Sequence, residues 1–123
     1  MVVRNPRVSA IKKSQRESML FRAIANLVQQ ASLDDRALAE LAISRVELSD
    51  DRSYCSVYFF SDLGRSHFDN FFEKLKLYKP SMRAALANQL QSRRTPQIIF
   101  KYDDQYAKTK EIEELLEQVK AED

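Results

Sequence analysis

Residues 41–60, LAISRVELSDDRSYCSVYFF, decide the fold of this chain. Apolar and polar residues alternate on both sides of residues 49–53, whose serine and aspartate side chains favour a turn. The flanking runs are rich in β-branched and aromatic residues, which pack well on a pleated sheet. The stretch therefore predicts a β-hairpin.

The alternation also predicts the details of each strand. In the first strand it changes phase between Ile43 and Val46, which predicts a β-bulge near Ser44 and Arg45. In the second strand one face is expected to be buried, with Cys55, Val57 and Phe59, and the opposite face to carry Tyr54, Ser56, Tyr58 and Phe60. Aromatic rings on the opposite face could stack on nucleic-acid bases, but burial under the C-terminal helix is the interpretation we favour.

Helical periodicity dominates the segments around the hairpin. Apolar spacing predicts a helix over residues 15–31, and Ser14 with Glu17 predicts a capping box at its start. A second apolar stripe begins at Phe68, and its helix should end or kink near Tyr78 because Pro80 lacks a backbone donor. A further helix follows and ends before Pro96.

A third strand and a last helix complete the predicted order, α-β-β-α-α-β-α, of one α+β domain. Residues 97–102 alternate, and the 36 residues between them and the second strand allow a right-handed crossover, which makes the two strands parallel. The last helix carries the apolar stripe Ile112, Leu115, Leu116 and Val119. That stripe could recruit another protein, but we expect it to dock on the sheet.

Composition limits the class of protein. A length of 123 residues and 44% hydrophobic content fit one ordinary domain. The chain has no apolar run long enough for a membrane span, and its start lacks the apolar run of a signal peptide, so we expect a cytoplasmic protein. One cysteine and one histidine are too few for a Cys/His metal cluster or an internal disulfide, and no cofactor is implied.

Charge is distributed unevenly along the chain. Residues 103–123 hold eight acidic and three basic side chains, a net charge of −5, whereas residues 1–102 hold 17 basic and 10 acidic ones, a net charge of +7. Such a basic body attracts a polyanion. We expect a flexible basic arm over residues 1–13, an RNA-binding domain over residues 14–104 and an acidic C-terminal helix or tail over residues 105–123.

Several short motifs resemble a known family. The element order resembles a type II KH domain. The motifs are Val46-Glu47-Leu48-Ser49, Val57-Tyr58 and Arg93-x-x-Pro96-x-Ile98-x-Phe100-x-x-Asp103, and together they resemble the ribosome-binding factor A family over about residues 15–119. The resemblance implies an RNA-binding factor that joins the immature small ribosomal subunit, assists late rRNA processing and folding, and supports growth in the cold. One departure lies at the helix junction, where Tyr78-Lys79-Pro80 stands in place of the family's usual Ala-x-Gly.

The candidate RNA-binding residues are basic side chains, chosen because the sequence has no Gly-x-x-Gly motif to bind an RNA backbone. Gly64 is the only glycine, so the Gly-x-x-Gly loop of ordinary KH domains is excluded and binding should rest on phosphate and shape contacts. No acidic residue occurs between Lys74 and Tyr102. The candidates are Lys12, Lys13, Arg16 and Arg22 in the arm and first helix, and Lys76, Lys79, Arg83, Arg93 and Arg94 around the helix junction. The expected partners are small-subunit rRNA and the small ribosomal subunit, with no membrane, no small-molecule substrate and a monomeric protein.

Other interpretations remain open. The basic residues could form a solvated helix face, or the chain could be a small protein-interaction module in which the sheet edge or the acidic tail binds a partner. An enzyme is not expected, because His67 has no obvious catalytic partner and Cys55 falls on the buried face of a strand. The aspartate pairs at residues 34–35, 50–51 and 103–104 fall between elements, where aspartate caps helices and closes turns.

Overall fold

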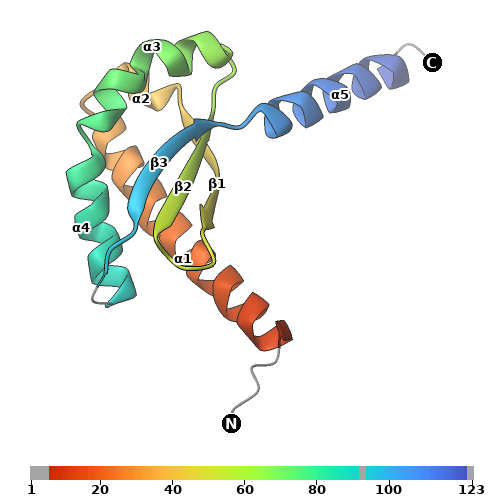
Figure 1. The fold of residues 1–123 in the computed structure, drawn as a ribbon. Coiled ribbons are helices and arrows are strands. Elements are labelled where there is room, and N and C mark those ends of the chain that lie inside the picture. Colours follow the sequence, from red (N-terminus) through yellow and green to blue (C-terminus); the bar gives the residue numbers. More distant parts are fainter. Residues whose placement is uncertain (1–5, 92–93, 122–123) are drawn as a thin grey trace.

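A computed structural model of the chain describes residues 6–91 and 94–121 (Figure 1). Its elements are α1 (Pro6–Ser32), α2 (Arg36–Ala39), β1 (Ala42–Leu48), β2 (Tyr54–Phe60), α3 (Arg65–Lys76), α4 (Lys79–Leu90), β3 (Gln97–Tyr102) and α5 (Asp104–Ala121). Apart from the short α2, this is the predicted order. The fold is α+β, a type II KH-like domain followed by a C-terminal helix.

The sheet has the predicted topology. Its strand order is β1-β2-β3, with β1 antiparallel to β2 and β2 parallel to β3. The register shifts between Ile43 and Arg45, which confirms the predicted bulge. Contacts from α1, α3 and α4 cover the face that carries Cys55, Val57 and Phe59, all of them fully buried. The apolar alternation of β2 therefore predicted the core face correctly.

The start of α1 was predicted wrongly. The helix begins at Pro6, so residues 6–13 are helical and Ser14 is not a cap. Proline is tolerated in the first turn of a helix, and no residue that breaks helices follows it. Glu17 does not form a capping box, because its Oε2 accepts a hydrogen bond from the backbone N–H of Leu48 at 2.9 Å. Residues 1–5 of the predicted basic arm lie outside the described residues, and the division into arm, domain and tail stays a prediction.

The short helix α2 was not predicted. It has four residues, too few for an apolar period, and it buries Leu38 against the core. Asp35 begins it by accepting a hydrogen bond from the backbone N–H of Ala37 at 3.1 Å. Asp35 is thus a helix cap, as the aspartate pairs at element boundaries indicated.

A similar role falls to Asp51 in the turn between β1 and β2. Its Oδ1 accepts hydrogen bonds from the Ser49 hydroxyl and from the Ser53 backbone N–H. Hydrogen bonding from Ser53 and then Ser49 lowers the pKa of Asp51 to about 2. The carboxylate therefore stays ionised and closes the turn, as predicted.

The helix break near Pro80 is confirmed. The first helix, α3, ends at Lys76, and α4 begins at Lys79 with Pro80 in its first turn. Leu77 and Tyr78 between them both have right-handed helical dihedral angles, with φ of −67° and −87°. The junction therefore needs no glycine.

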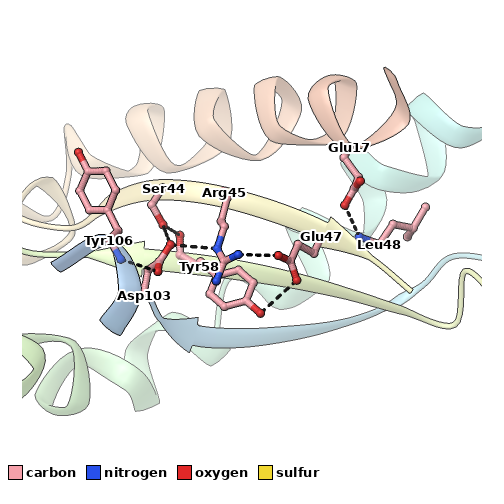
Figure 2. A network of polar contacts seen from close by, with 8 residues as sticks. All are labelled: Glu17, Ser44, Arg45, Glu47, Leu48, Tyr58, Asp103 and Tyr106. Carbon is pink, nitrogen blue, oxygen red and sulfur yellow. Dashed lines mark hydrogen bonds and ion pairs between the residues drawn. The ribbon is translucent and has the colours of Figure 1, made fainter. Parts of the chain in front are cut away.

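Asp103 joins three elements through one buried carboxylate, which is 3% exposed. Ser44 Oγ and Arg45 Nε donate to its Oδ2 at 2.6 and 3.0 Å, and the Tyr106 N–H donates to its Oδ1 at 3.0 Å. Figure 2 shows these three groups around the carboxylate. Ser44 and Arg45 belong to the bulge of β1, and Tyr106 to the first turn of α5. The carboxylate thus ties the bulge to the end of β3 and caps α5.

This arrangement overturns the expected docking of α5 on the sheet. Figure 1 shows α5 pointing away from the rest of the molecule, and its apolar stripe (Ile112, Leu115, Leu116 and Val119) is 51–61% exposed. The helix starts at the capped end of β3 and continues in the direction that the cap sets. A periodic stripe predicts which face of a helix is apolar but not where the helix points.

The pKa of Asp103 reflects its contacts. Burial by itself raises this pKa, but the hydrogen bonds from Ser44 and from the Tyr106 N–H, together with the Arg45 guanidinium, outweigh burial and lower it. A carboxyl group whose pKa is lower in the folded state stabilises the protein above its unfolded pKa. That contribution is lost as the pH falls through the folded pKa.

We predict that Asp103→Asn lowers the free energy of unfolding by about 1.5–3 kcal/mol at pH 7, the usual range for hydrogen bonds to a charged group. Urea unfolding measured from pH 7 down to pH 2 tests this. The difference between the variant and the wild type should begin to shrink below about pH 4, the ordinary pKa of an aspartate in the unfolded chain, and should disappear below the lower pKa of the folded state. Asp69→Asn is the control, because Asp69 is exposed and its ion pair with Arg65 is long, at 3.9 Å. Equal losses in the two variants would contradict the role given to Asp103.

We further predict that Cys55 is inert in the folded protein. Its side chain is fully buried, and burial, with a smaller effect of the Glu17 carboxylate, raises its pKa to about 12. The thiol is therefore protonated and inaccessible at pH 8. A chromogenic disulfide reagent should label it only as urea unfolds the chain, in parallel with loss of circular dichroism. Rapid labelling without urea would show that β2 is accessible in the native state.

Candidate nucleic-acid interface

Basic residues line the side of the molecule where α4 meets β3. Lys79 and Arg83 are four residues apart in α4 and so lie on one face of that helix. Lys79 Nζ is 5.3 Å from the centre of the Phe100 ring in β3, and Arg83 Nη2 is 3.5 Å from the Thr95 carbonyl just before β3. Arg94 precedes Thr95 and is exposed. We call Lys79, Arg83 and Arg94 the α4–β3 row.

Lys76 extends this row toward the helix junction. It lies in the last turn of α3, where its Nζ is 4.9 Å from the centre of the Phe72 ring and 3.1 Å from Glu73 Oε1. The ring orients the stem of the side chain, while the exposed carboxylate offsets part of its charge. The remaining candidate of this group, Arg93, lies outside the described residues.

The candidates in α1 do not form one surface. Lys13 lies on the stripe that faces the sheet, and its Nζ is 3.0 Å from Asp50 Oδ1, a hydrogen bond that raises its pKa. Arg16 is half-buried, whereas Lys12 and Arg22 are exposed. Arg22 lies midway between the buried residues Leu20 and Ile24 in sequence, so it points away from the core. Lys12 and Arg16, four residues apart, lie on one face of α1. Lys13 is paired with Asp50, and Arg22 lies on another side of the helix.

The sheet face turned away from α1 carries two basic residues that the sequence did not single out. Arg45 and Lys101 flank Tyr58 in the register of the strands. The Arg45 guanidinium is 4.0 Å from the centre of the Tyr58 ring, and Lys101 Nζ is 5.6 Å from it. Glu47 accepts hydrogen bonds from both Arg45 and the Tyr58 hydroxyl (Figure 2). The strand alternation could have found this cluster, since all four residues share one face.

The aromatic residues of β2 differ in how they are covered. Phe60 contacts α5, with its ring centre 4.9 Å from that of Tyr106 and 4.8 Å from Lys110 Nζ. Tyr54 remains 50% exposed, and the two cations that approach Tyr58 come from neighbouring strands. Burial under the C-terminal helix was therefore predicted correctly for Phe60 and wrongly for Tyr54 and Tyr58.

Other candidate chemistry has a structural explanation. His67 Nε2 is 3.0 Å from the Ala37 carbonyl and connects α3 to α2. Among the described residues, no group of three or more histidine, cysteine, aspartate or glutamate side chains could hold a metal ion. None of the helices in the described part of the chain has the length and apolar character needed to cross a membrane.

Known proteins match both the sequence and the structure. A family model described as ribosome-binding factor A matches residues 12–116. Ribosome-binding factor A of Clostridium botulinum (strain Eklund 17B / Type B) is 32% identical over 101 residues, covering 80% of this chain and 86% of the relative. The crystal structure of ribosome-binding factor A from Thermus thermophilus aligns with a TM-score of 0.60 and 31% identity, covering 73% of this chain and 93% of that one.

A second structural match is a Thermus thermophilus ribosome-binding factor A homology model fitted into a cryo-EM map of a 30S complex. It has a TM-score of 0.50 and 30% identity, and it covers 68% of this chain and 86% of that chain. The family model spans most of α1 through most of α5. The chain belongs to the ribosome-binding factor A family.

Proposed function

We propose that this protein binds the small ribosomal subunit through contacts of the α4–β3 row with rRNA phosphates. The observation that carries the proposal is the row itself, Lys79, Arg83 and Arg94, in a segment without an acidic residue from Lys74 to Tyr102. A related protein has been fitted as a homology model into a map of a 30S complex, which supports the small subunit as the particle.

The side chains of the row suit phosphate recognition. Arginine presents a planar fork of donors that can bind two phosphate oxygens, and lysine adds a compact positive charge. Packing of Lys79 against Phe100 and of Arg83 against the Thr95 carbonyl keeps both cations beside the strand. Side chains that are already oriented lose less conformational entropy when they bind, so these two contacts favour phosphate binding by Lys79 and Arg83.

The domain has no glycine loop for reading an RNA sequence, which favours recognition of RNA by its shape. Gly64, the only glycine, has φ of +89° and directly precedes α3, so no Gly-x-x-Gly loop is available to clamp an RNA backbone. Phosphate contacts position a protein on RNA but carry no sequence information directly. We infer that the protein recognises a folded rRNA junction and assists late processing and folding of immature small-subunit rRNA as a cytoplasmic monomer without a cofactor. Support of growth in the cold belongs to the same proposal.

We predict that Arg83→Gln combined with Arg94→Gln weakens the salt dependence of binding to small-subunit rRNA. Each lost phosphate contact should reduce the slope of log affinity against log salt by about 0.7–0.9, so two contacts reduce it by about 1.4–1.8. Filter binding at several salt concentrations measures the slope. Both side chains are exposed, so urea unfolding of the variant should match that of the wild type.

The matched control is Arg36→Gln combined with Arg52→Gln, which removes the same charge from exposed residues in α2 and in the hairpin turn. Arg45 is unsuitable as a control because it binds Asp103. If the two double variants have equal salt slopes, net charge alone explains the change in slope, and the α4–β3 row is rejected as the site. If neither variant changes rRNA binding, the protein-interaction module with incidental basic charge replaces the RNA-binding proposal.

A further inference from the structure

The exposed stripe of α5 is an apolar surface that the proposed RNA contacts do not use. Its four large side chains (Ile112, Leu115, Leu116 and Val119) recur at helical spacing, and each is more than half exposed. Single exposed apolar residues are common on proteins, but a continuous stripe marks an interaction site. Leaving such a stripe in water costs free energy that a partner would recover.

Contacts in the first two turns of α5 prevent this stripe from reaching the chain's own sheet. Asp103 caps the helix, Tyr106 packs on Phe60, and Lys110 Nζ is 2.7 Å from Asp62 Oδ1. Lys110 is the last of these anchors, and the stripe begins two residues later at Ile112. Folding the stripe back onto the sheet would require breaking these contacts together.

The charge around the stripe identifies what can cover it. Residues 111–121 carry four glutamates and one lysine, a net charge of −3. Helical spacing places Glu111 on one border of the stripe and Glu113 with Lys120 on the other, while Glu114 and Glu117 lie farther around the helix. RNA phosphates are repelled by such a surface. Pairing with α5 of a second copy would bring two segments of −3 together, which like-charge repulsion disfavours.

We propose that α5 docks into an apolar groove bordered by lysine or arginine on a basic protein of the small-subunit particle. The choice of particle rests on the proposed function. The stripe supplies an i, i+3, i+4, i+7 set of anchors, as in other helices that bind grooves, and the glutamates complement the basic borders. The chain thereby makes two kinds of contact, with its basic body on rRNA and its acidic helix on a protein.

Binding to two purified targets tests the proposal, namely intact small ribosomal subunits and protein-free small-subunit rRNA. Leu115→Gln combined with Leu116→Gln keeps good helix formers and removes the centre of the stripe. We expect this variant to bind intact subunits about tenfold more weakly or worse, with unchanged affinity for protein-free rRNA. The control is Leu33→Gln combined with Leu63→Gln, which removes two leucines that are 85% and 60% exposed outside α5 and should change neither affinity.

A pair of charge variants tests the borders. Glu111→Gln combined with Glu113→Gln should weaken binding to intact subunits several-fold at low salt. Glu114→Gln combined with Glu117→Gln removes the same charge from the far side of the helix and should weaken it less. Equal losses for the two pairs would show that only the overall charge of α5 matters and would reject the groove.

Three outcomes would overturn the docking proposal. If the stripe variant also binds protein-free rRNA more weakly, α5 contacts RNA. If its affinity for both targets is unchanged, the stripe is not a docking site. A wild-type dimer in sedimentation velocity that the stripe variant abolishes identifies a second copy as the occupant. A photo-cross-linking phenylalanine analogue in place of Leu116 adds a direct test, since it should label a basic protein of the purified subunit and not rRNA.

Failure of the proposed function would look different. In that case Arg83→Gln combined with Arg94→Gln leaves rRNA binding unchanged, while the stripe variant still binds intact subunits more weakly than the wild type. The docking proposal would then stand and the phosphate-binding row would not. Absence of any wild-type binding to intact subunits would reject both.

Discussion

The buried carboxylate of Asp103 is the interaction on which the arrangement of the surfaces depends. It accepts hydrogen bonds from Ser44 and Arg45, which lie 59 and 58 positions earlier in the chain, and from Tyr106 in the first turn of α5. A buried charge is tolerable only when it is fully hydrogen-bonded, so this set of donors has to form as a unit. The β-bulge supplies the geometry, because it brings Ser44 and Arg45 together at the end of β3.

Two functional consequences follow from that carboxylate. Arg45, held by Asp103 on one side and Glu47 on the other, lies over the Tyr58 ring and limits access to it (Figure 2). The cap on α5 sets the direction of that helix, so the acidic segment points away from the basic body (Figure 1). Charges of +7 and −5 within one chain would attract each other, and a fixed direction keeps the acidic segment from covering the α4–β3 row.

The helix junction between α3 and α4 forms without a glycine. Tyr78 has ordinary helical dihedral angles and packs half-buried against the core. Pro80 begins α4 in the first turn, where its missing N–H needs no partner. The break therefore depends on proline chemistry and on the packing of Tyr78, and Lys79 is left beside Phe100 at the edge of the sheet.

Local patterns in the sequence determined the three strands, the parallel crossover, the break near Pro80 and the buried face of β2, since each depends on periodicity or on backbone restrictions of single residues. They also identified the row of basic residues as a candidate. Only the tertiary structure decided what Glu17 binds and where α5 points. Glu17 bonds to Leu48 across 31 positions, and Asp103 bonds to Ser44 across 59. Such contacts join residues far apart in the chain, so no local period contains them, and they override the local signals at Ser14 and in the apolar stripe of α5.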